Sequence, residues 1–400
     1  MSNLSMEARP RNQYSATPMA YHWNWFHNFD FDRFASKDNL YRAFEVIRNK
    51  DKAKGVDGVA IEHLSNGEVL ELCKALSRCL KSSEFPYRRQ PLRRVEIPKF
   101  SGGYREIQIP TVRDRLVLKA FQIATADFWH SKLPFLRQSR WNIVWNIELA
   151  CQAGNTWIGS FDIANCYPSL SLASAIDFHQ EALIESIGLG RTEPLHELCL
   201  SLFPNEGNDG DGGIPQGASY AATLAENFLH TIFKNLEEDG TSLLRYVDNI
   251  YVTGNSRRQV EESRANIQQT LGQHQLRLKD EQTILDLSRN YVECLGIRLK
   301  WDCNQQRLIT LAPQDWHETM FESITQTDDS SIQRSLTDTY ISAYASLTPQ
   351  HLEESITERL SQLGITPGRY SSFQELWRES RTSNQRLRHA ISRRPVIQPS

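Results

Sequence analysis

The stretch Leu243-Leu244-Arg245-Tyr246-Val247-Asp248-Asn249-Ile250-Tyr251-Val252 carries the strongest fold signal in the chain. Two runs of aliphatic and aromatic residues flank a polar pair, which predicts strands over 243–247 and 250–253 joined by a tight turn. Asp248 and Asn249 are expected at the tip, because Asp and Asn tolerate a positive φ. An ordinary hairpin turn has the same pattern, so this stretch alone does not define a functional site.

A second carboxylate follows a buried strand that comes earlier in the chain. Residues 156–163 predict an apolar strand, and Asp162 stands near its end. Two carboxylates from distant strands are the smallest protein contribution to a pair of Mg²⁺ ions held ~3.5–4 Å apart. Mg²⁺ prefers oxygen ligands, and the ions relieve the repulsion between the two carboxylates. Asp162 and Asp248 therefore predict a site for two Mg²⁺ ions, with Mn²⁺ as an alternative.

A glycine-containing segment lies between the two carboxylates and is predicted to open a helix that runs through Leu229. Glycine allows the backbone to approach a base pair closely, and the side chain of Gln216 can hydrogen-bond across a groove. A plain Pro/Gly helix start remains the alternative. The segment reads Gly213-Ile214-Pro215-Gln216-Gly217-Ala218-Ser219-Tyr220.

Charge and composition restrict the class of protein. The 400 residues carry a net charge of -3, which argues against a simple DNA-coating protein and confines any nucleic-acid surface to part of the molecule. Residues 81–119 hold ten Lys and Arg against four acids, and a second, arginine-rich run occupies 378–394. Both runs could bind phosphate, although each could equally be a solvated face.

Cysteine spacing and hydropathy predict the compartment. The seven cysteines form no C-x-x-C pair, so neither a zinc site nor a disulfide framework is expected and a reducing cytoplasm fits best. Residues 1–12 are polar, and no apolar run is long enough to cross a bilayer. We expect a cytoplasmic protein with no membrane partner.

Taken in order over roughly residues 39–300, these segments resemble the reverse transcriptase family. The family's first catalytic motif is similar to Phe161-Asp162-Ile163-Ala164-Asn165-Cys166-Tyr167-Pro168-Ser169. Its Pro-Gln-Gly motif is similar to Ile214-Pro215-Gln216-Gly217, and its Tyr-x-Asp-Asp box is similar to Tyr246-Val247-Asp248-Asn249. The segment before the fingers in the family is similar to Gly55-Val56-Asp57-Gly58, and its primer grip is similar to Cys294-Leu295-Gly296. The family's fingers signature is similar to Ile97-Pro98-Lys99, Gly102-Gly103-Tyr104-Arg105-Glu106-Ile107 and Ile109-Pro110-Thr111-Val112-Arg113-Asp114-Arg115.

The resemblance implies an α+β right-hand polymerase. Residues 1–38 would be an N-terminal extension. Residues 39–312 would form the fingers and a palm with an antiparallel sheet flanked by helices. Residues 313–400 would form an α-helical thumb or C-terminal region, in which the sequence predicts helices from Pro313 onward, broken at 326–331 and 364–368.

The resemblance also implies a role for each site residue. The catalytic positions are Asp162, Asp248 and Asn249, and the metal-binding positions are Asp162, Ile163 and Asp248. The nucleotide-binding positions are Lys99, Arg105, Tyr167, Gln216 and Gly217, and two further site residues are Tyr246 and Lys279. In the family, the aromatic residue under the sugar excludes a 2′ hydroxyl, while a lysine and an arginine grip the triphosphate. Exposed strand charges are the alternative reading of Lys99 and Arg105.

Three positions depart from the family pattern. The second aspartate of the Tyr-x-Asp-Asp box is Asn249. The Lys-Thr pair that follows the catalytic hairpin in the family is Gln282-Thr283, and the nearest lysine is Lys279. Ser139-Arg140-Trp141-Asn142 replaces the usual Gly-Phe-Arg segment. We therefore expect a divergent member of the family.

The function implied by the resemblance is that of an RNA-directed DNA polymerase. It would use dNTPs and an RNA template, expected to be a dedicated non-coding RNA, and would release a DNA product. The motifs resemble bacterial reverse transcriptases of the retron and group II intron type. Because no zinc-binding endonuclease module is seen after the thumb, the chain is most similar to those associated with phage defence and abortive infection, by analogy alone. The alternatives are untemplated DNA synthesis and a catalytically weak or inactive RNA-binding module of polymerase fold. An accessory protein or a homo-oligomer is compatible with each.

Overall fold

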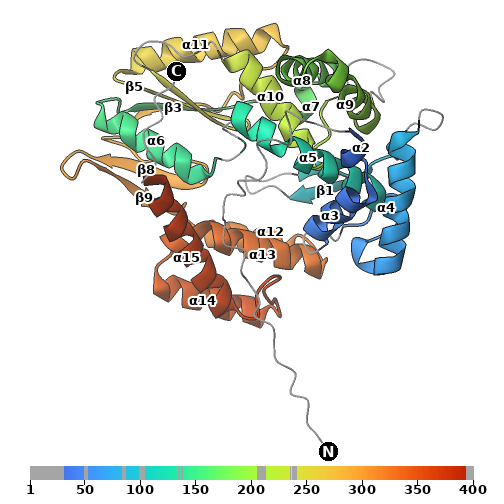
Figure 1. Ribbon diagram of the computed structural model, residues 1–400. Coiled ribbons are helices and arrows are strands. Elements are labelled where there is room, and N and C mark those ends of the chain that lie inside the picture. Colours follow the sequence, from blue (N-terminus) through green and yellow to red (C-terminus); the bar gives the residue numbers. More distant parts are fainter. Residues whose placement is uncertain are drawn as a thin grey trace, which may run out of the picture.

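The computed structural model describes residues 31–48, 53–82, 87–98, 104–133, 136, 138–204, 213–234, 236 and 241–392. Within this part of the chain, helices surround three antiparallel sheets (Figure 1). The predicted α+β class, with an antiparallel sheet flanked by helices, is confirmed. None of the described helices combines the length and the apolar character needed to cross a membrane.

The described helices and strands follow one another along the chain from Phe31 to Ser392. The helices are α2 (Phe31–Phe34), α3 (Lys37–Ile47), η1 (Ile61–His63), α4 (Asn66–Lys81), α5 (Val112–Lys132), α6 (Arg140–Gln152), α7 (Cys166–Ser169), α8 (Leu172–Ile187), α9 (Leu189–Leu202), α10 (Ala221–Phe233), α11 (Arg257–Gln273), α12 (Trp316–Thr325), α13 (Ser330–Tyr344), η3 (Ala345–Leu347), α14 (Gln350–Gln362) and α15 (Phe373–Ser392). The strands are β1 (Arg93–Pro98), β2 (Tyr104–Ile109), β3 (Trp157–Asp162), β4 (Ser242–Tyr246), β5 (Asn249–Gly254), β6 (Thr283–Asp286), β7 (Val292–Cys294), β8 (Ile297–Asp302) and β9 (Arg307–Leu311).

The central sheet positions both predicted carboxylates. Its strand order is β4-β5-β3-β6, and every pairing is antiparallel. β3 therefore lies between two strands that come much later in the sequence. This order places the end of β3, with Asp162, beside the start of β5, and the two Cα partners there are Asp162 and Asn249.

Helices cover both faces of the central sheet, so its strands are apolar on both sides. Helices α10 and α11 share one hydrophobic cluster with Phe161, Ile250 and Val252. On the opposite face, α6 packs with Ile158 and Tyr251 in a second cluster (Figure 1). Successive residues of a strand point to opposite faces, so neighbouring residues of β5 enter different clusters.

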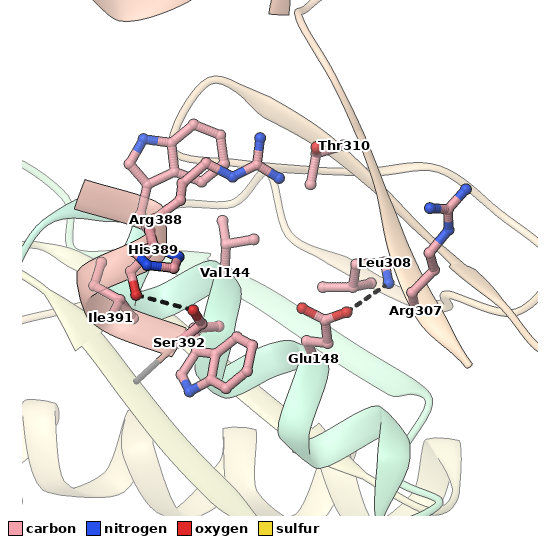
Figure 2. A pocket seen from close by; sticks show the side chains of 11 residues that line it. Val144, Glu148, Arg307, Leu308, Thr310, Arg388, His389, Ile391 and Ser392 are labelled. Carbon is pink, nitrogen blue, oxygen red and sulfur yellow. Dashed lines mark hydrogen bonds between the residues drawn. The ribbon is translucent and has the colours of Figure 1, made fainter. Parts of the chain in front are cut away.

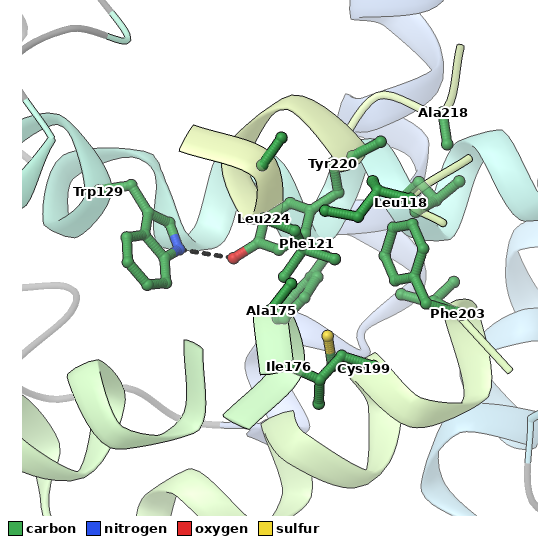
Figure 3. Packing of buried hydrophobic residues seen from close by; sticks show 14 of the residues in the cluster. Leu118, Phe121, Trp129, Ala175, Ile176, Cys199, Phe203, Ala218, Tyr220 and Leu224 are labelled. Atoms are coloured by element: carbon green, nitrogen blue, oxygen red, sulfur yellow. Dashed lines mark hydrogen bonds between the residues drawn. The ribbon is translucent and has the colours of Figure 1, made fainter. Parts of the chain in front are cut away.

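The segment that follows the Pro-Gln-Gly motif is anchored in the main core. Tyr220 is fully buried, and its hydroxyl accepts a hydrogen bond from Trp129 Nε1 (Figure 3). The same hydroxyl lies 2.9 Å from Nε2 of His179. Burial lowers the pKa of His179 to about 3, so this imidazole stays neutral. The buried hydroxyl therefore has partners on two other helices, α5 and α8, which fix the start of α10.

Helix α4 begins at a defined N-cap. The short 3₁₀ helix η1 precedes it, and the boundary between the two falls at Ser65. The Ser65 hydroxyl accepts a hydrogen bond from Glu68 N, and the Glu68 carboxylate accepts one from Ser65 N. This capping box satisfies backbone donors at a new helix start, which explains why the helix begins here.

The C-terminal helices α12–α15 enclose a hydrophobic cluster of their own, which includes Trp316, Phe321, Tyr340 and Trp377. The predicted helical character from residue 313 and both predicted breaks are confirmed. α15 also packs against α6, where Trp141 Nε1 donates to Asn384 Oδ1 at 3.3 Å. The domain boundaries at 38 and 312 remain predictions.

Candidate active site

The two predicted carboxylates come together at the edge of the central sheet. Asp162 is the last residue of β3, and Asp248 lies in the turn between β4 and β5. The backbone N–H of Ile163 donates to the carbonyl of Asp248 at 3.1 Å, which ties the end of β3 to the turn. The sequence signal therefore identified both residues, and the strand order explains their proximity.

The geometry of the turn differs from the prediction. Tyr246 pairs with Asn249, so the two turn residues are Val247 and Asp248, and Asn249 already belongs to β5. The positive φ, +57°, falls on Val247 rather than on Asp248 or Asn249. A β-branched residue adopts this region only under strain. The surrounding contacts must therefore hold the turn in place.

A buried ion pair supplies one of these contacts. Nη1 of Arg245 donates to the carbonyl of Val247 at 3.1 Å and to Oε2 of Glu226 at 2.8 Å. Nη2 of Arg245 bonds the other carboxylate oxygen of Glu226. The side chains of Arg245 and Glu226 are only 1% and 6% exposed. A bidentate pair with this geometry is directional, and it links the catalytic turn to helix α10.

The electrostatics of the two aspartates differ. Burial, followed by the negative charge of Asp162, raises the pKa of Asp248 above its ordinary value. The side-chain amide of Asn249 donates to Oδ1 of Asp248 at 3.2 Å. In Asp162, Oδ2 lies 2.8 Å from Lys279 Nζ, while Oδ1 is buried and has no hydrogen-bond partner among the described residues.

These features fit divalent metal ions. Two close carboxylates repel each other unless cations lie between them, and Oδ1 of Asp162 has an unused lone pair. No group of three or more His, Cys, Asp or Glu residues suited to a metal occurs in the described part of the chain. A pair of carboxylates suits Mg²⁺, which keeps several waters and shares substrate phosphates rather than filling an all-protein cage.

Lys279 lies at the site because its backbone segment pairs with the segment that follows β3. An isolated antiparallel bridge joins Ile163 to Leu278, and Lys279 N donates to Asp162 O at 2.8 Å. Gln282, which occupies the family's lysine position, instead donates from Nε2 to the carbonyl of Lys279 at 2.8 Å. Lys279 thus places its ammonium 2.8 Å from Oδ2 of Asp162.

A cleft of about 650 Å³ opens over the carboxylates. It contains nine of the predicted site residues: Arg105, Asp162, Ile163, Tyr167, Gln216, Tyr246, Asp248, Asn249 and Lys279. Lys99 lies outside the described residues. Sequence reasoning missed other residues of its lining, including Glu106, Gln108, Asn165 and Leu295. Alternation along β2 would place Glu106 and Gln108 on the face opposite Arg105, so it gave no signal for them.

Tyr167 forms part of the cleft wall. It is partly buried against the main core, and its carbonyl accepts a hydrogen bond from Ile214 N at 2.9 Å. Gly213 allows this approach, because a Cβ there would lie 2.3 Å from the carbonyl oxygen of Pro168. The first catalytic motif and the Pro-Gln-Gly motif are therefore joined directly.

Gln216 and Gly217 pack against strand β2. Gln108 N donates to Gln216 O at 2.7 Å. Gly217 has a φ of +120°, and a Cβ there would lie 2.7 Å from Ile107 Cγ2. Gly217 thus supports the turn that places Gln216 in the cleft, against Gln108 of β2. A larger residue would separate the turn from the strand.

Only part of the basic run over 81–119 is available for phosphate. Arg115 is buried and donates to Ala53 O at 2.6 Å. Arg113 lies over the ring of Tyr87, at 5.0 Å from its centroid. The expectation that this run could bind phosphate is therefore wrong for the buried Arg115, and Arg113 packs on Tyr87. Arg88, Arg93 and Arg94 are exposed.

A second cavity, of about 430 Å³, lies away from the carboxylates, between α6, β9 and α15 (Figure 2). Its acid, Glu148, accepts a hydrogen bond from Leu308 N at 3.2 Å. Arg388, from the arginine-rich C-terminal run, lies over the Trp141 ring at 4.5 Å. This arginine thus contributes to packing between α15 and α6.

Comparison with known proteins identifies the family. Residues 97–299 match the family model described as "Reverse transcriptase (RNA-dependent DNA polymerase)". The chain belongs to the reverse transcriptase family. The matched range contains the cleft residues that the structure brings together, so the family assignment and the geometry refer to the same part of the chain.

The relatives are distant and longer. The "Putative COX1/OXI3 intron 2 protein" of Saccharomyces cerevisiae (strain ATCC 204508 / S288c) is 22% identical over 208 residues, which make up 50% of this chain and 23% of the yeast protein. The structure of apo telomerase from Candida Tropicalis aligns with a TM-score of 0.45 and 12% identity, over 75% of this chain and 63% of the telomerase chain. The chain therefore spans less than a quarter of the yeast relative.

Proposed function

We propose that this chain is an RNA-directed DNA polymerase that joins deoxynucleotides by two-metal nucleotidyl transfer. The observation that carries the proposal is the convergence of Asp162, at the end of β3, and Asp248, in the turn between β4 and β5, in the lining of one cleft. The cleft also contains an arginine suited to phosphate, Arg105, and two residues suited to a nucleotide, Tyr167 and Gln216. Membership of the reverse transcriptase family supports the same reaction.

The proposed roles follow the geometry. Bound divalent ions would activate a 3′ hydroxyl and stabilise the leaving pyrophosphate. Asp162 and Asp248 would hold them, with Ile163 beside them in the cleft. Lys99 and Arg105 would bind the triphosphate, although Lys99 lies outside the described residues.

The remaining nucleotide contacts would come from Tyr167, Gln216 and Gly217. The ring of Tyr167 would lie against the sugar and exclude a 2′ hydroxyl, so that the product is DNA. Gln216 would line the base pair between template and nucleotide, held by Gly217. Tyr246, at the end of β4, would border the growing strand. Residues 39–312 would form fingers and palm, and 313–400 the thumb.

The direct test is incorporation of labelled dNTPs by the purified protein with Mg²⁺, in the presence of an RNA template with a DNA primer or of any RNA that co-purifies. We expect DNA whose sequence is complementary to the RNA. Synthesis that survives RNase treatment and omission of template would instead support untemplated polymerisation. Ribonucleotide controls at equal concentration report sugar selection at Tyr167.

A second candidate is an RNA-binding module of polymerase fold that has lost catalysis. Asn249 in the catalytic box and Gln282 at the family's lysine position favour it. This candidate predicts RNA binding without incorporation at any concentration of Mg²⁺ or Mn²⁺. Activity of the wild type with either ion would exclude it.

We further propose a cytoplasmic role in bacterial antiphage defence, with a dedicated non-coding RNA as template. The resemblance of the motifs to defence-associated reverse transcriptases supports it, and seven cysteines with no disulfide among them fit a reducing compartment. The test compares phage plating on cells that express the wild type or Asp248→Asn. Equal plating efficiency on both strains, over a broad panel of phages, would count against the defence role. An accessory protein or a second copy of the chain that is required for activity should co-purify in the same cells.

A further inference from the structure

One ion pair in the cleft joins a lysine to a proposed metal ligand. Lys279 Nζ lies 2.8 Å from Oδ2 of Asp162. The backbone fixes the base of this side chain, because Lys279 N donates to the carbonyl of Asp162 and the preceding residue, Leu278, bridges to Ile163. The ammonium thus reaches Asp162 from a position that the fold sets.

From this geometry we infer that Lys279 is an internal counterion of the metal site, which neutralises Asp162 before a divalent ion binds and which the ion must displace. The inference rests on the proposed function, because it takes Asp162 and Asp248 as the metal ligands. An ammonium and a divalent cation that share one carboxylate repel each other strongly at such short distances. Binding of the ion and the ion pair with Lys279 therefore compete.

The side chain of Lys279 is free enough to leave. It is 51% exposed, and a lysine ammonium sits on a flexible four-carbon stem. Half-exposed ion pairs contribute little to stability, so breaking this one costs little. The other oxygen of Asp162, Oδ1, is buried and has no hydrogen-bond partner among the described residues, so it carries an unused lone pair.

The charges that line the cleft determine how tightly a metal ion should bind in the absence of nucleotide. Glu106 and Arg105 of β2 also line the cleft, and their opposite charges balance. Asn249 contributes no negative charge, so the first ion depends on Asp162 and Asp248, and Lys279 cancels one of them. Metal affinity without nucleotide should then be low. A triphosphate adds negative charge to the cleft and offers the displaced ammonium a new partner, so nucleotide and metal should bind cooperatively.

The test measures Mn²⁺ binding by electron paramagnetic resonance on the full chain without nucleotide. Lys279→Gln keeps a hydrogen-bonding side chain but removes the charge, and we expect its Kd for Mn²⁺ to fall about three- to tenfold. Arg277→Gln is the matched control. Arg277 is exposed, lies two residues away on the same segment and does not line the cleft. We expect its Kd to equal that of the wild type.

A third variant separates this inference from the proposed function. Asp162→Asn should abolish the Mn²⁺ site. If it does, and Lys279→Gln binds Mn²⁺ no more tightly than the wild type, the counterion role is wrong while the metal site stands. If Asp162→Asn leaves binding unchanged, both the metal site and the counterion role are wrong. An equal gain in Lys279→Gln and Arg277→Gln would also overturn the inference, since it would reflect general charge alone.

Discussion

The side-chain amide of Asn249 donates a hydrogen bond to the carboxylate of Asp248, with 3.2 Å between Nδ2 and Oδ1. An aspartate at position 249 would place a negative charge at this distance and repel Asp248. Asparagine instead orients Asp248 and still offers a neutral carbonyl oxygen to a hard cation. The substitution thus lowers the charge of the proposed metal site without removing a ligand.

This contact predicts the effect of Asn249→Asp. One more negative charge should strengthen metal binding, so the Mg²⁺ concentration that gives half-maximal DNA synthesis should fall by several-fold, and any preference for Mn²⁺ should weaken. Asn249→Ala is the control that removes the hydrogen bond without adding charge, and it should raise the Mg²⁺ requirement. If the wild type shows no DNA synthesis with either ion and Asn249→Asp restores it, the natural protein has lost its catalytic activity.

The raised pKa of Asp248 predicts how stability depends on pH. A carboxyl group whose folded-state pKa is raised binds protons more tightly in the folded state, so stability falls as pH rises from the ordinary Asp value through the raised one. At pH 7 without metal, Asp248→Asn should therefore stabilise the protein by on the order of 1 kcal/mol, or roughly 2 °C in Tm. The gain should vanish below about pH 4. Thermal unfolding in EDTA from pH 4 to 8 measures it, and a gain that is constant over this range would refute the assignment.

The buried pair of Arg245 and Glu226 predicts a strongly non-additive mutant cycle. Glu226→Gln leaves the Arg245 guanidinium buried without its counterion, which should cost about 3–5 kcal/mol. The double variant Glu226→Leu/Arg245→Met removes both charges and should cost less than the single one. Urea unfolding at pH 7 gives the free energies. Equal losses in the single and double variants would show that the pair does not hold the turn.

Sequence patterns predicted the parts of the fold that depend on local signals. The alternating residues of 243–253 indicated the hairpin, and the apolar run before Asp162 indicated β3. The positive φ at Val247 could not be predicted. The carbonyl of Val247 is held by Arg245, and Arg245 is in turn paired with the buried carboxylate of Glu226 on α10. Local propensity favours Asp or Asn at such a position, and tertiary contacts overrode that preference.

The candidate site was predictable where its residues belong to ordered motifs, as for Asp162, Tyr167, Gln216 and Asp248. The contact between Lys279 and Asp162 was not, since it results from the bridge between Ile163 and Leu278, residues 115 apart in the numbering. Charge counting also failed for Arg115. Its position on α5, which is buried along most of its length, decides its role.

Two exposed arginines of β1 predict how RNA affinity depends on salt. Each phosphate contact contributes about 0.7–0.9 to the slope of log K against log salt. Arg93→Gln/Arg94→Gln should therefore flatten the slope by about 1.4–1.8 for RNA bound along the fingers. The matched control, Arg257→Gln/Arg258→Gln, removes the same charge from α11, where both arginines pair with glutamates. RNA titrations at four salt concentrations measure the slope for each variant. Equal slopes in the two variants would mean that the RNA does not contact Arg93 and Arg94.

The central claim is that Asp162 and Asp248 form the catalytic metal site of a DNA polymerase. The most direct measurement compares single-nucleotide incorporation by the wild type, Asp162→Asn and Asp248→Asn at saturating Mg²⁺, with circular dichroism to confirm that each variant is folded. We expect incorporation by the wild type and a loss of at least about 10³-fold in each variant, since metal ligands of this kind contribute several kcal/mol to the transition state. Incorporation that persists in either folded variant within about tenfold of the wild type would contradict it.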